Sequence, residues 1–277
     1  MAEKKIQLIL RDAGIGSRRK VEELIRERRV TLNGQIVEHP GLAADPDRDH
    51  IKLDGKLLHF EDTVNYYYLF NKPRNVVSTM DDPQGRPCVG DLVRKMGRNL
   101  FSVGRLDFDA EGLMVLTNDG ALAQTLSHPS AEVPRTYLVK IKGHPDEEAL
   151  SAIHEGMDLG EGDRLGKIRV TIVGRREGST WVRVVIFEGK KNEIKRVFLR
   201  IRYPVRTIRR IGFGPLRLGD LPVGRWRSLT DEELEKTLAL AEAKEKRGPK
   251  PPRPAGPRPS PASSPSRRGG RIRNVDK

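Results

Sequence analysis

The first 60 residues carry the hydrophobic pattern of two short helices followed by two hairpins. Apolar side chains recur three and four residues apart in both helical segments, so each helix can bury one face. The expected buried positions are Ile6, Ile9, Leu10 and Ala13 in the first helix and Val21, Leu24 and Ile25 in the second. We expect Gly14 to end the first helix and Ser17 to cap the second.

Each of the two strand pairs that follow is built around a tight turn. Residues 30–37 turn at Asn33-Gly34, and residues 51–58 turn at Asp54-Gly55. Asn-Gly and Asp-Gly readily adopt the positive φ angles that two-residue hairpin turns require. The pattern therefore predicts a compact unit of two helices and two hairpins over residues 3–60.

Strand and helix patterns alternate from residue 64 to residue 235. Most strand segments alternate apolar and polar positions, which favours antiparallel pairing. The expected strands are 66–71, 75–79, 112–117, 136–143, 167–173 and 181–187. The expected helices are 89–96, 119–127, 145–156, 192–202 and 230–243, the last beginning with the capping-box residues Thr230 and Glu233. We predict an α+β domain with a mixed, mainly antiparallel sheet and flanking helices.

Charge adds a basic C-terminal tail to this picture. The chain has 52 Lys and Arg against 38 Asp and Glu, a formal net charge of +14. Residues 244–277, rich in Pro, Ser and Arg, hold eleven of the cations and two of the acids, a net charge of +9. We expect this tail to be disordered and to act as an electrostatic arm toward a polyanion, with a merely solubilising appendage as the alternative.

Several classes of protein do not fit the sequence. Cys88 is the one cysteine, so no internal disulfide can form, and the six histidines lack the paired spacing of a zinc site. Neither a P-loop nor a dinucleotide-binding glycine motif occurs. Apolar runs are far shorter than the roughly 18 residues of a membrane span. We expect a cytoplasmic monomer that uses no metal and no organic cofactor.

The most informative segment is VGRLDFDAEGLMVLTNDG, residues 103–120. Gly104 and Gly112 bracket a polar loop, and the apolar run after it is typical of a fully buried strand. Asp107 is therefore expected beside a core. The segment resembles the pseudouridine synthases of the RsuA/RluB branch, whose Gly-Arg-Leu-Asp motif carries the catalytic aspartate. The N-terminal unit resembles the S4 RNA-binding domain.

This resemblance covers residues 3–235 and implies isomerisation of uridine to pseudouridine in RNA. The glycosidic bond breaks, the uracil rotates, and its C5 atom is joined to the ribose. Asp107 would stabilise or capture the positive charge that develops on the ribose. Residue types leave open whether it attacks C1′, adds to the base, or removes a C2′ proton. Ala110 departs from the family pattern, because a threonine is expected there.

Tyr137 and Lys195 complete the catalytic set that the resemblance implies. Tyr137 shares a strand face with Val139 and Ile141, where its ring could stack on uracil and its hydroxyl could remove the C5 proton. A core tyrosine with an ordinary hydrogen bond is the alternative. Lys195 matches the family segment that supplies a cation to the aspartate, since a buried carboxylate needs such a partner to stay ionised.

Seven basic side chains are expected to contact RNA. Arg105 would fill the place of a flipped nucleotide, with phosphate binding or a salt bridge to Asp109 as alternatives. Lys72 precedes Pro73 in another family segment and is assigned to shaping the site and the RNA path. The remaining five lie in or next to predicted helices, where phosphate could contact them but where solvated cations are also common: Arg18, Arg19, Lys20, Lys190 and Arg196.

The resemblance implies ribosomal RNA as the substrate. The long basic tail favours the large-subunit branch of the family over the small-subunit branch. This makes 23S rRNA the preferred target and 16S rRNA the alternative. A non-catalytic RNA-binding or ribosome-assembly protein would have the same charge but no reason to keep Asp107, Tyr137 and Lys195 together. An RNA N-glycosidase would use Asp107 similarly and release free uracil.

Overall fold

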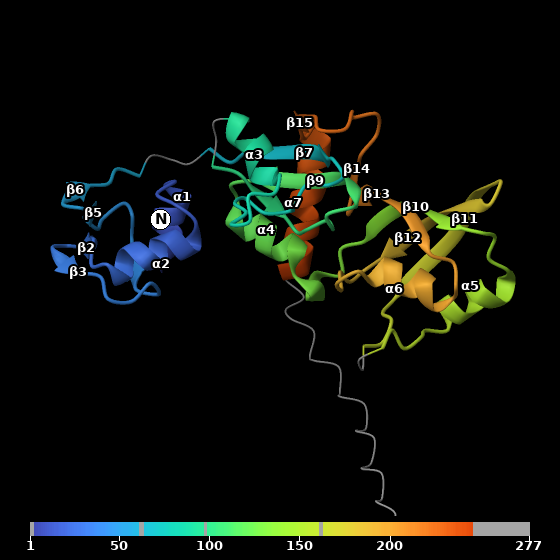
Figure 1. Ribbon diagram of the computed structural model, residues 1–277. Helices are drawn as coiled ribbons and strands as arrows, with labels where there is room; N and C mark the ends of the chain where they lie inside the picture. The colour runs from blue at the N-terminus through green and yellow to red at the C-terminus, as the bar shows by residue number, and fades with distance from the viewer. Residues whose placement is uncertain (1–2, 61–63, 97–98, 161–162, 246–277) are drawn as a thin grey trace, which may run out of the picture.

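The computed structural model describes residues 3–60, 64–96, 99–160 and 163–245 (Figure 1). The expected tail, residues 244–277, lies outside this range apart from its first two residues. The N-terminal unit contains α1 (Ile6–Asp12) and α2 (Arg18–Arg26). Its strands are β1 (Lys4–Lys5), β2 (Val30–Leu32), β3 (Gln35–Ile36), β4 (Ala43–Ala44), β5 (Ile51–Leu53) and β6 (Lys56–Leu57).

Local signals in this unit act as the sequence predicts. The Ser17 hydroxyl accepts a hydrogen bond from the Lys20 backbone N–H at 3.2 Å, so the cap of α2 is confirmed. Asn33 and Gly34 have φ angles of 51° and 86°, as a tight hairpin turn requires. The apolar stripes are buried except for Ala13, which is exposed because α1 ends one residue earlier.

The second unit is built on one large sheet with the strand order β11-β12-β10-β13-β9-β7-β15. Two short strands extend it, since β8 pairs with β9 and β14 pairs with β13. All pairings are antiparallel except β13 with β9, so the prediction of a mixed, mainly antiparallel sheet is confirmed. The bounds are β7 (Tyr67–Lys72), β8 (Phe101–Val103), β9 (Glu111–Thr117), β10 (Arg135–Lys142), β11 (Ile168–Arg176), β12 (Ser179–Ile186), β13 (Val205–Phe213), β14 (Leu216–Arg217) and β15 (Trp226–Ser228).

Helices cover the two faces of this sheet at different places (Figure 1). One core contains side chains of α3 (Val89–Val93), α5 (Glu147–His154) and α6 (Glu193–Arg200), packed on one face of the sheet. The other contains side chains of α4 (Gly120–Ser127) and α7 (Asp231–Glu245), packed on the opposite face of β7 and β9. Strand β9 contributes to both cores, so it is buried on both faces as its continuous apolar run predicts. Two 3₁₀ turns, Arg94–Met96 and Pro129–Ala131, complete the described elements.

One expectation about strands is wrong, and one long strand, β13, was missed. Residues 75–79 form no strand beyond an isolated bridge between Val77 and Cys88, and Asn75 has a φ of 59°. Strand β13 was not expected, because its alternation is interrupted by polar residues. One of these, Arg210, is 1% exposed and donates from Nε to the Leu113 carbonyl at 2.6 Å.

Gly112 permits the one parallel pairing among the described strands of this sheet, between β9 and β13. It pairs with Arg210 and has a φ of 115°. A Cβ atom at this position would lie 2.3 Å from the Arg210 carbonyl oxygen. Only glycine fits both the dihedral angle and the close approach, and this fixes the path of the chain directly after residues 104–110.

Candidate active site

A pocket of about 360 Å³ lies where the loop before β9, strand β10 and the start of α6 meet. Asp107, Tyr137 and Lys195 all line it, although they come from three separate parts of the sequence. Arg105 also lines it. The volume falls within the range of small-molecule sites, so the pocket has room for a nucleotide-sized ligand. The structure thus brings together the three residues expected to be catalytic.

Asp107 is held by its backbone rather than by burial of its side chain. The loop carbonyl groups accept hydrogen bonds from neighbouring segments: Ser78 Oγ donates to Leu106 O at 2.6 Å, and Asn75 N donates to Phe108 O at 2.7 Å. The Asp107 side chain is 40% exposed, so the expectation of a buried carboxylate is wrong. The Asp107 side chain therefore lines the pocket, and hydrogen bonds to the backbone carbonyl groups on either side of it hold the loop in place.

Lys72 supplies the innermost support of this loop. Its side chain is fully buried, and Nζ donates to the carbonyl oxygens of Pro73 at 2.9 Å, Asp107 at 3.3 Å and Ala110 at 2.9 Å. Direct contact between Lys72 and RNA, which we expected, does not fit a side chain with no exposed surface. The expectation that Lys72 shapes the site agrees with these contacts. Ala110 stands where the family threonine was expected, and its backbone N–H donates to Asp107 O at 3.1 Å.

Lys195 contacts two carboxylates. Its Nζ lies 3.7 Å from Asp107 Oδ2 and 2.5 Å from Asp109 Oδ1. Partial burial raises the pKa of Asp109, but the hydrogen bond and charge of Lys195 outweigh it and hold that pKa below the ordinary value. The expected partner of Asp107 is therefore in place, but it is shared. Sequence reasoning missed Asp109 as the nearer partner, and the only available signal was its position two residues after Asp107.

Tyr137 lines the pocket from strand β10. It is 7% exposed and faces the same side of β10 as Val139 and Ile141, as expected. Its hydroxyl makes no hydrogen bond to any residue that the structure describes. The alternative of a core tyrosine with an ordinary hydrogen bond therefore has no support, and the hydroxyl is available to a ligand.

The expected RNA-binding residues differ in whether they form ion pairs with carboxylates of the protein. Arg105 is exposed and makes no ion pair within the described part of the chain, so the alternative of a salt bridge to Asp109 is wrong. In α2, Arg18 pairs with Glu22 at 3.0 Å and Lys20 pairs with Glu23 at 2.8 Å, whereas Arg19 has no such partner among the described residues. The basic start of this helix is partly neutralised by its own next turn.

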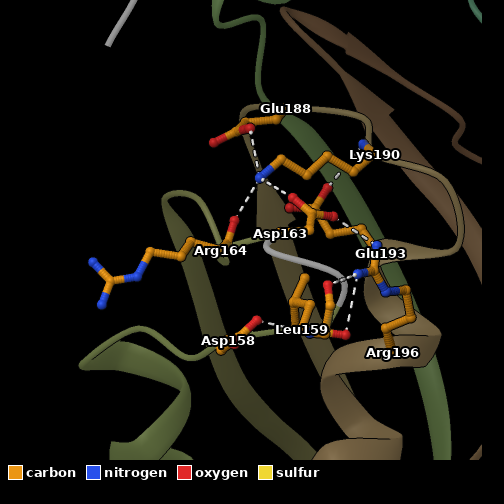
Figure 2. A network of polar contacts seen from close by, with 9 residues as sticks. Asp158, Leu159, Asp163, Arg164, Glu188, Lys190, Glu193 and Arg196 are labelled. Atoms are coloured by element: carbon orange, nitrogen blue, oxygen red, sulfur yellow. Dashed lines mark hydrogen bonds and ion pairs between the residues drawn. The ribbon is translucent and has the colours of Figure 1, made fainter. Parts of the chain in front are cut away.

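Lys190 and Arg196 belong to an ion-pair network centred on Asp163 (Figure 2). Lys190 Nζ lies 2.9 Å from Asp163 Oδ1, and Arg196 Nη1 lies 2.7 Å from Oδ2. These two cations hold the pKa of Asp163 below its ordinary value. Arg196 also donates to the Leu159 carbonyl at 3.1 Å. Both side chains therefore tie the loop before β11 to α6, and their contact with RNA stays a prediction.

Neither a metal-binding cluster nor a membrane-spanning helix is found among the described residues. Within the ranges that the structure describes, no three His, Cys, Asp or Glu side chains are grouped so that they could hold a metal ion. No described helix combines the length and the apolar character needed to cross a bilayer.

Comparison with known proteins identifies the class to which this fold and pocket belong. Residues 66–200 match the family of RNA pseudouridylate synthases, and residues 4–48 match the S4 domain. The chain belongs to the RNA pseudouridine synthases of the RsuA/RluB branch with an N-terminal S4 domain.

Several relatives support this membership over most of their length. The chain is 41% identical to an uncharacterized RNA pseudouridine synthase of Mycobacterium leprae, over 83% of this chain and 90% of the relative. It is 35% identical to the ribosomal large subunit pseudouridine synthase B of Bacillus subtilis, over 86% of this chain and 97% of that protein. A crystal structure of a pseudouridylate synthase, 28% identical, superposes with a TM-score of 0.60 over 85% of this chain and all of that one.

Replacing Lys72 with methionine should change the pH dependence of stability. Burial lowers the pKa of Lys72 to about 8, whereas an unfolded lysine titrates near about 10.4. Between these values the unfolded wild type binds more protons than the folded one, so its free energy of unfolding should rise with pH relative to Lys72→Met. Well below pH 8 the difference in the free energy of unfolding between the two proteins should not depend on pH.

Urea unfolding of both proteins at pH 7, 8, 9 and 10 measures this difference. An exposed lysine, Lys52, provides the matched control, and Lys52→Met should track the wild type at every pH. A wild-type advantage over Lys72→Met that stays constant or falls as the pH rises from 8 to 10 would contradict a Lys72 pKa lowered by burial.

Proposed function

We propose that this RNA pseudouridine synthase isomerises a specific uridine in ribosomal RNA, with 23S rRNA preferred to 16S rRNA. The observation that carries the reaction is the pocket shared by Asp107, Tyr137 and Lys195. Support for the substrate comes from the Bacillus subtilis relative, which is named for the large ribosomal subunit and is covered over 97% of its length. The net charge of +14 favours a polyanionic partner of this kind.

In the proposed reaction each residue meets a different part of the flipped nucleotide. Asp107 faces the ribose and stabilises or captures the charge at C1′ when the bond to the base breaks. Tyr137 supports the base and removes the C5 proton once C5 has been joined to the sugar. Arg105 occupies the gap that the flipped nucleotide leaves in the RNA stack. Lys195 acts as the cationic partner of Asp107.

We infer that three segments of the chain have different roles. Residues 3–60 would bind RNA as the S4 domain, residues 64–235 would perform the isomerisation, and residues 244–277 would act as an electrostatic arm. Arg18, Arg19 and Lys20 would contact phosphate, as would Lys190 and Arg196 where their ion pairs open. We propose that the protein works as a cytoplasmic monomer.

Release of tritium from RNA labelled at uridine C5 tests the proposed reaction. Isomerisation frees the C5 hydrogen and keeps the base attached, so tritium should appear in water without free uracil. An N-glycosidase would release labelled uracil instead, and a non-catalytic RNA-binding protein would release neither. Only the first outcome is compatible with the proposal.

The substrate is tested separately by mapping pseudouridines in rRNA from cells with and without the gene. Loss of one pseudouridine in 23S rRNA is expected. Loss confined to 16S rRNA would move the protein to the small-subunit target, and an unchanged map of both rRNAs would refute a ribosomal substrate.

Deleting residues 244–277 should weaken RNA binding without changing the chemical step. The deletion removes a net charge of +9. Each lost phosphate contact should flatten the dependence of log affinity on log salt concentration by about 0.7 to 0.9. Binding titrations between 50 and 200 mM salt, roughly the range over which such contacts are resolved, measure the slope. An unchanged slope would mean that the tail does not contact RNA.

A further inference from the structure

Arg135 is a buried cation in the pocket that the catalytic set does not use. It is the first residue of β10 and faces the same side as Tyr137, two residues along the strand. Its side chain lines the pocket together with Asp107 and Tyr137, and the residue is only 8% exposed. Nη1 is buried and has no hydrogen-bond partner among the described residues.

The surroundings of Arg135 do not neutralise its charge. The described residues offer it no hydrogen bond and no ion pair, and its guanidinium carbon lies over the Phe213 ring, 5.7 Å from the ring centroid. Glu193 also lines the pocket and is 4% exposed, but burial raises the pKa of this carboxyl group, and it forms no ion pair with Arg135. A buried cation without a partner is costly, so a group that it binds is expected to enter from the pocket.

The position of Arg135 relative to Tyr137 indicates which part of a nucleotide it meets. Side chains two residues apart on a strand are separated by about 6.7 Å. A pyrimidine ring stacked on Tyr137 can therefore direct a carbonyl oxygen toward the guanidinium. Asp107, which comes from the loop before β9, is left to the ribose. Arg135 thus lies on the base side of the bond that breaks.

We propose that Arg135 is a further catalytic residue, which hydrogen-bonds a carbonyl oxygen of the flipped uracil and stabilises the negative charge of the base when the N1–C1′ bond breaks. This role rests on the proposed isomerisation. A guanidinium suits it because it stays protonated and presents several N–H donors in a plane. Because Arg135 is held with little exposure to solvent, such a preorganised donor is worth more than it would be in water.

The electrons and protons of this step balance within the nucleotide. When the N1–C1′ bond breaks, its electron pair stays on the base and spreads over N1 and the carbonyl oxygens, which face Arg135. After rotation, C5 forms the new bond to C1′ with the C5–C6 electron pair. The C5 proton leaves to the Tyr137 oxygen as that hydroxyl releases its own proton to solvent, and N1 takes one proton from solvent, so the base becomes neutral again and the hydroxyl is restored. Arg135 gives up no proton at any stage.

Three variants of the full chain test this role. Arg135→Met removes the charge, and Arg135→Lys keeps a charge but loses the planar donor set. Arg183→Met is the matched control, because Arg183 is exposed on the neighbouring strand β12 and points to the opposite face of the sheet from the buried Val182 and Val184. Single-turnover tritium release from C5-labelled 23S and 16S transcripts gives the rate, and titration of the same RNA gives the dissociation constant.

We expect Arg135→Met to lower the single-turnover rate by about 10²- to 10³-fold with little change in the dissociation constant. Arg135→Lys should fall between this variant and the wild type, and Arg183→Met should match the wild type. Added guanidinium should raise the rate of Arg135→Met, and an equal concentration of ethylammonium should raise it less.

The opposite results overturn the proposal in distinct ways. A weaker dissociation constant with an unchanged rate would make Arg135 a phosphate contact. If Arg135→Met fails to fold, a wild-type rate for a folded Arg135→Lys would make the residue structural. Release by the wild type combined with equal rates in all variants refutes the role of Arg135 alone. No release by the wild type refutes the proposed function and this role with it.

Discussion

Asp107→Asn should abolish pseudouridine formation while leaving the fold and RNA affinity nearly intact. The amide has almost the same shape as the carboxylate but can neither capture C1′ nor balance a positive ribose. We expect the rate to fall by at least about 10³-fold, the upper end for the loss of one electrostatic stabiliser. The loop should stay in place because it is held through backbone carbonyl groups, including that of Asp107 itself, by Lys72.

Asp109→Asn is the control for this prediction. Asp109 lies in the same loop, is half-exposed like Asp107, and binds the same lysine at 2.5 Å. Its replacement removes an equal charge from the same place and should cost less than about tenfold in rate, because Lys195 then pairs with Asp107 alone. Comparable losses in the two variants would mean that the loop needs its net charge and not a particular carboxylate.

Lys195→Met should lower the single-turnover rate by about 100-fold. At 3.7 Å, an ion pair at an effective dielectric constant of about 20 is worth at most about 4.5 kcal/mol. Solvent reaches both side chains and reduces this value, and 100-fold corresponds to about 2.7 kcal/mol. Single-turnover measurements with the labelled transcripts determine the loss.

Adding Asp109→Asn to Lys195→Met sharpens this test. Without the lysine, two carboxylates in one loop repel each other, so removing one of them should recover part of the rate. Arg200→Met, an exposed change on the same helix, should leave the rate unchanged. A Lys195→Met variant with wild-type rate would show that Asp107 functions without this cation.

The sequence predicted the elements whose signals are local. Asn33-Gly34 sets the sign of two φ angles, and Ser17 supplies an oxygen to the first turn of α2, so neither depends on distant residues. The loop carrying Asp107 was found because an uninterrupted apolar run follows it. The prediction of a strand at 75–79 failed for the opposite reason, since the Ser78 hydroxyl and the Asn75 backbone N–H donate to the loop carbonyl groups of Leu106 and Phe108.

The sequence indicated which residues form the site better than it indicated the contacts that their side chains make. Lys72 stands in a family segment, but a basic residue beside a proline gives no sign that it will be fully buried under three carbonyl groups. Asp109 and Arg135 were missed because their roles depend on which strands and helices meet at the pocket. Lys190 and Arg196 look like phosphate ligands in the sequence, although Asp163 engages both in the fold.

The central claim is that the carboxylate of Asp107 meets the sugar of a flipped uridine in this pocket. A structure of Asp107→Asn bound to its RNA measures this directly. The account predicts that the target uridine leaves the stack, with its C1′ atom in contact with the side chain at position 107 and its base against Tyr137. A bound complex in which the uridine stays stacked, or enters with C1′ away from that side chain, would contradict it.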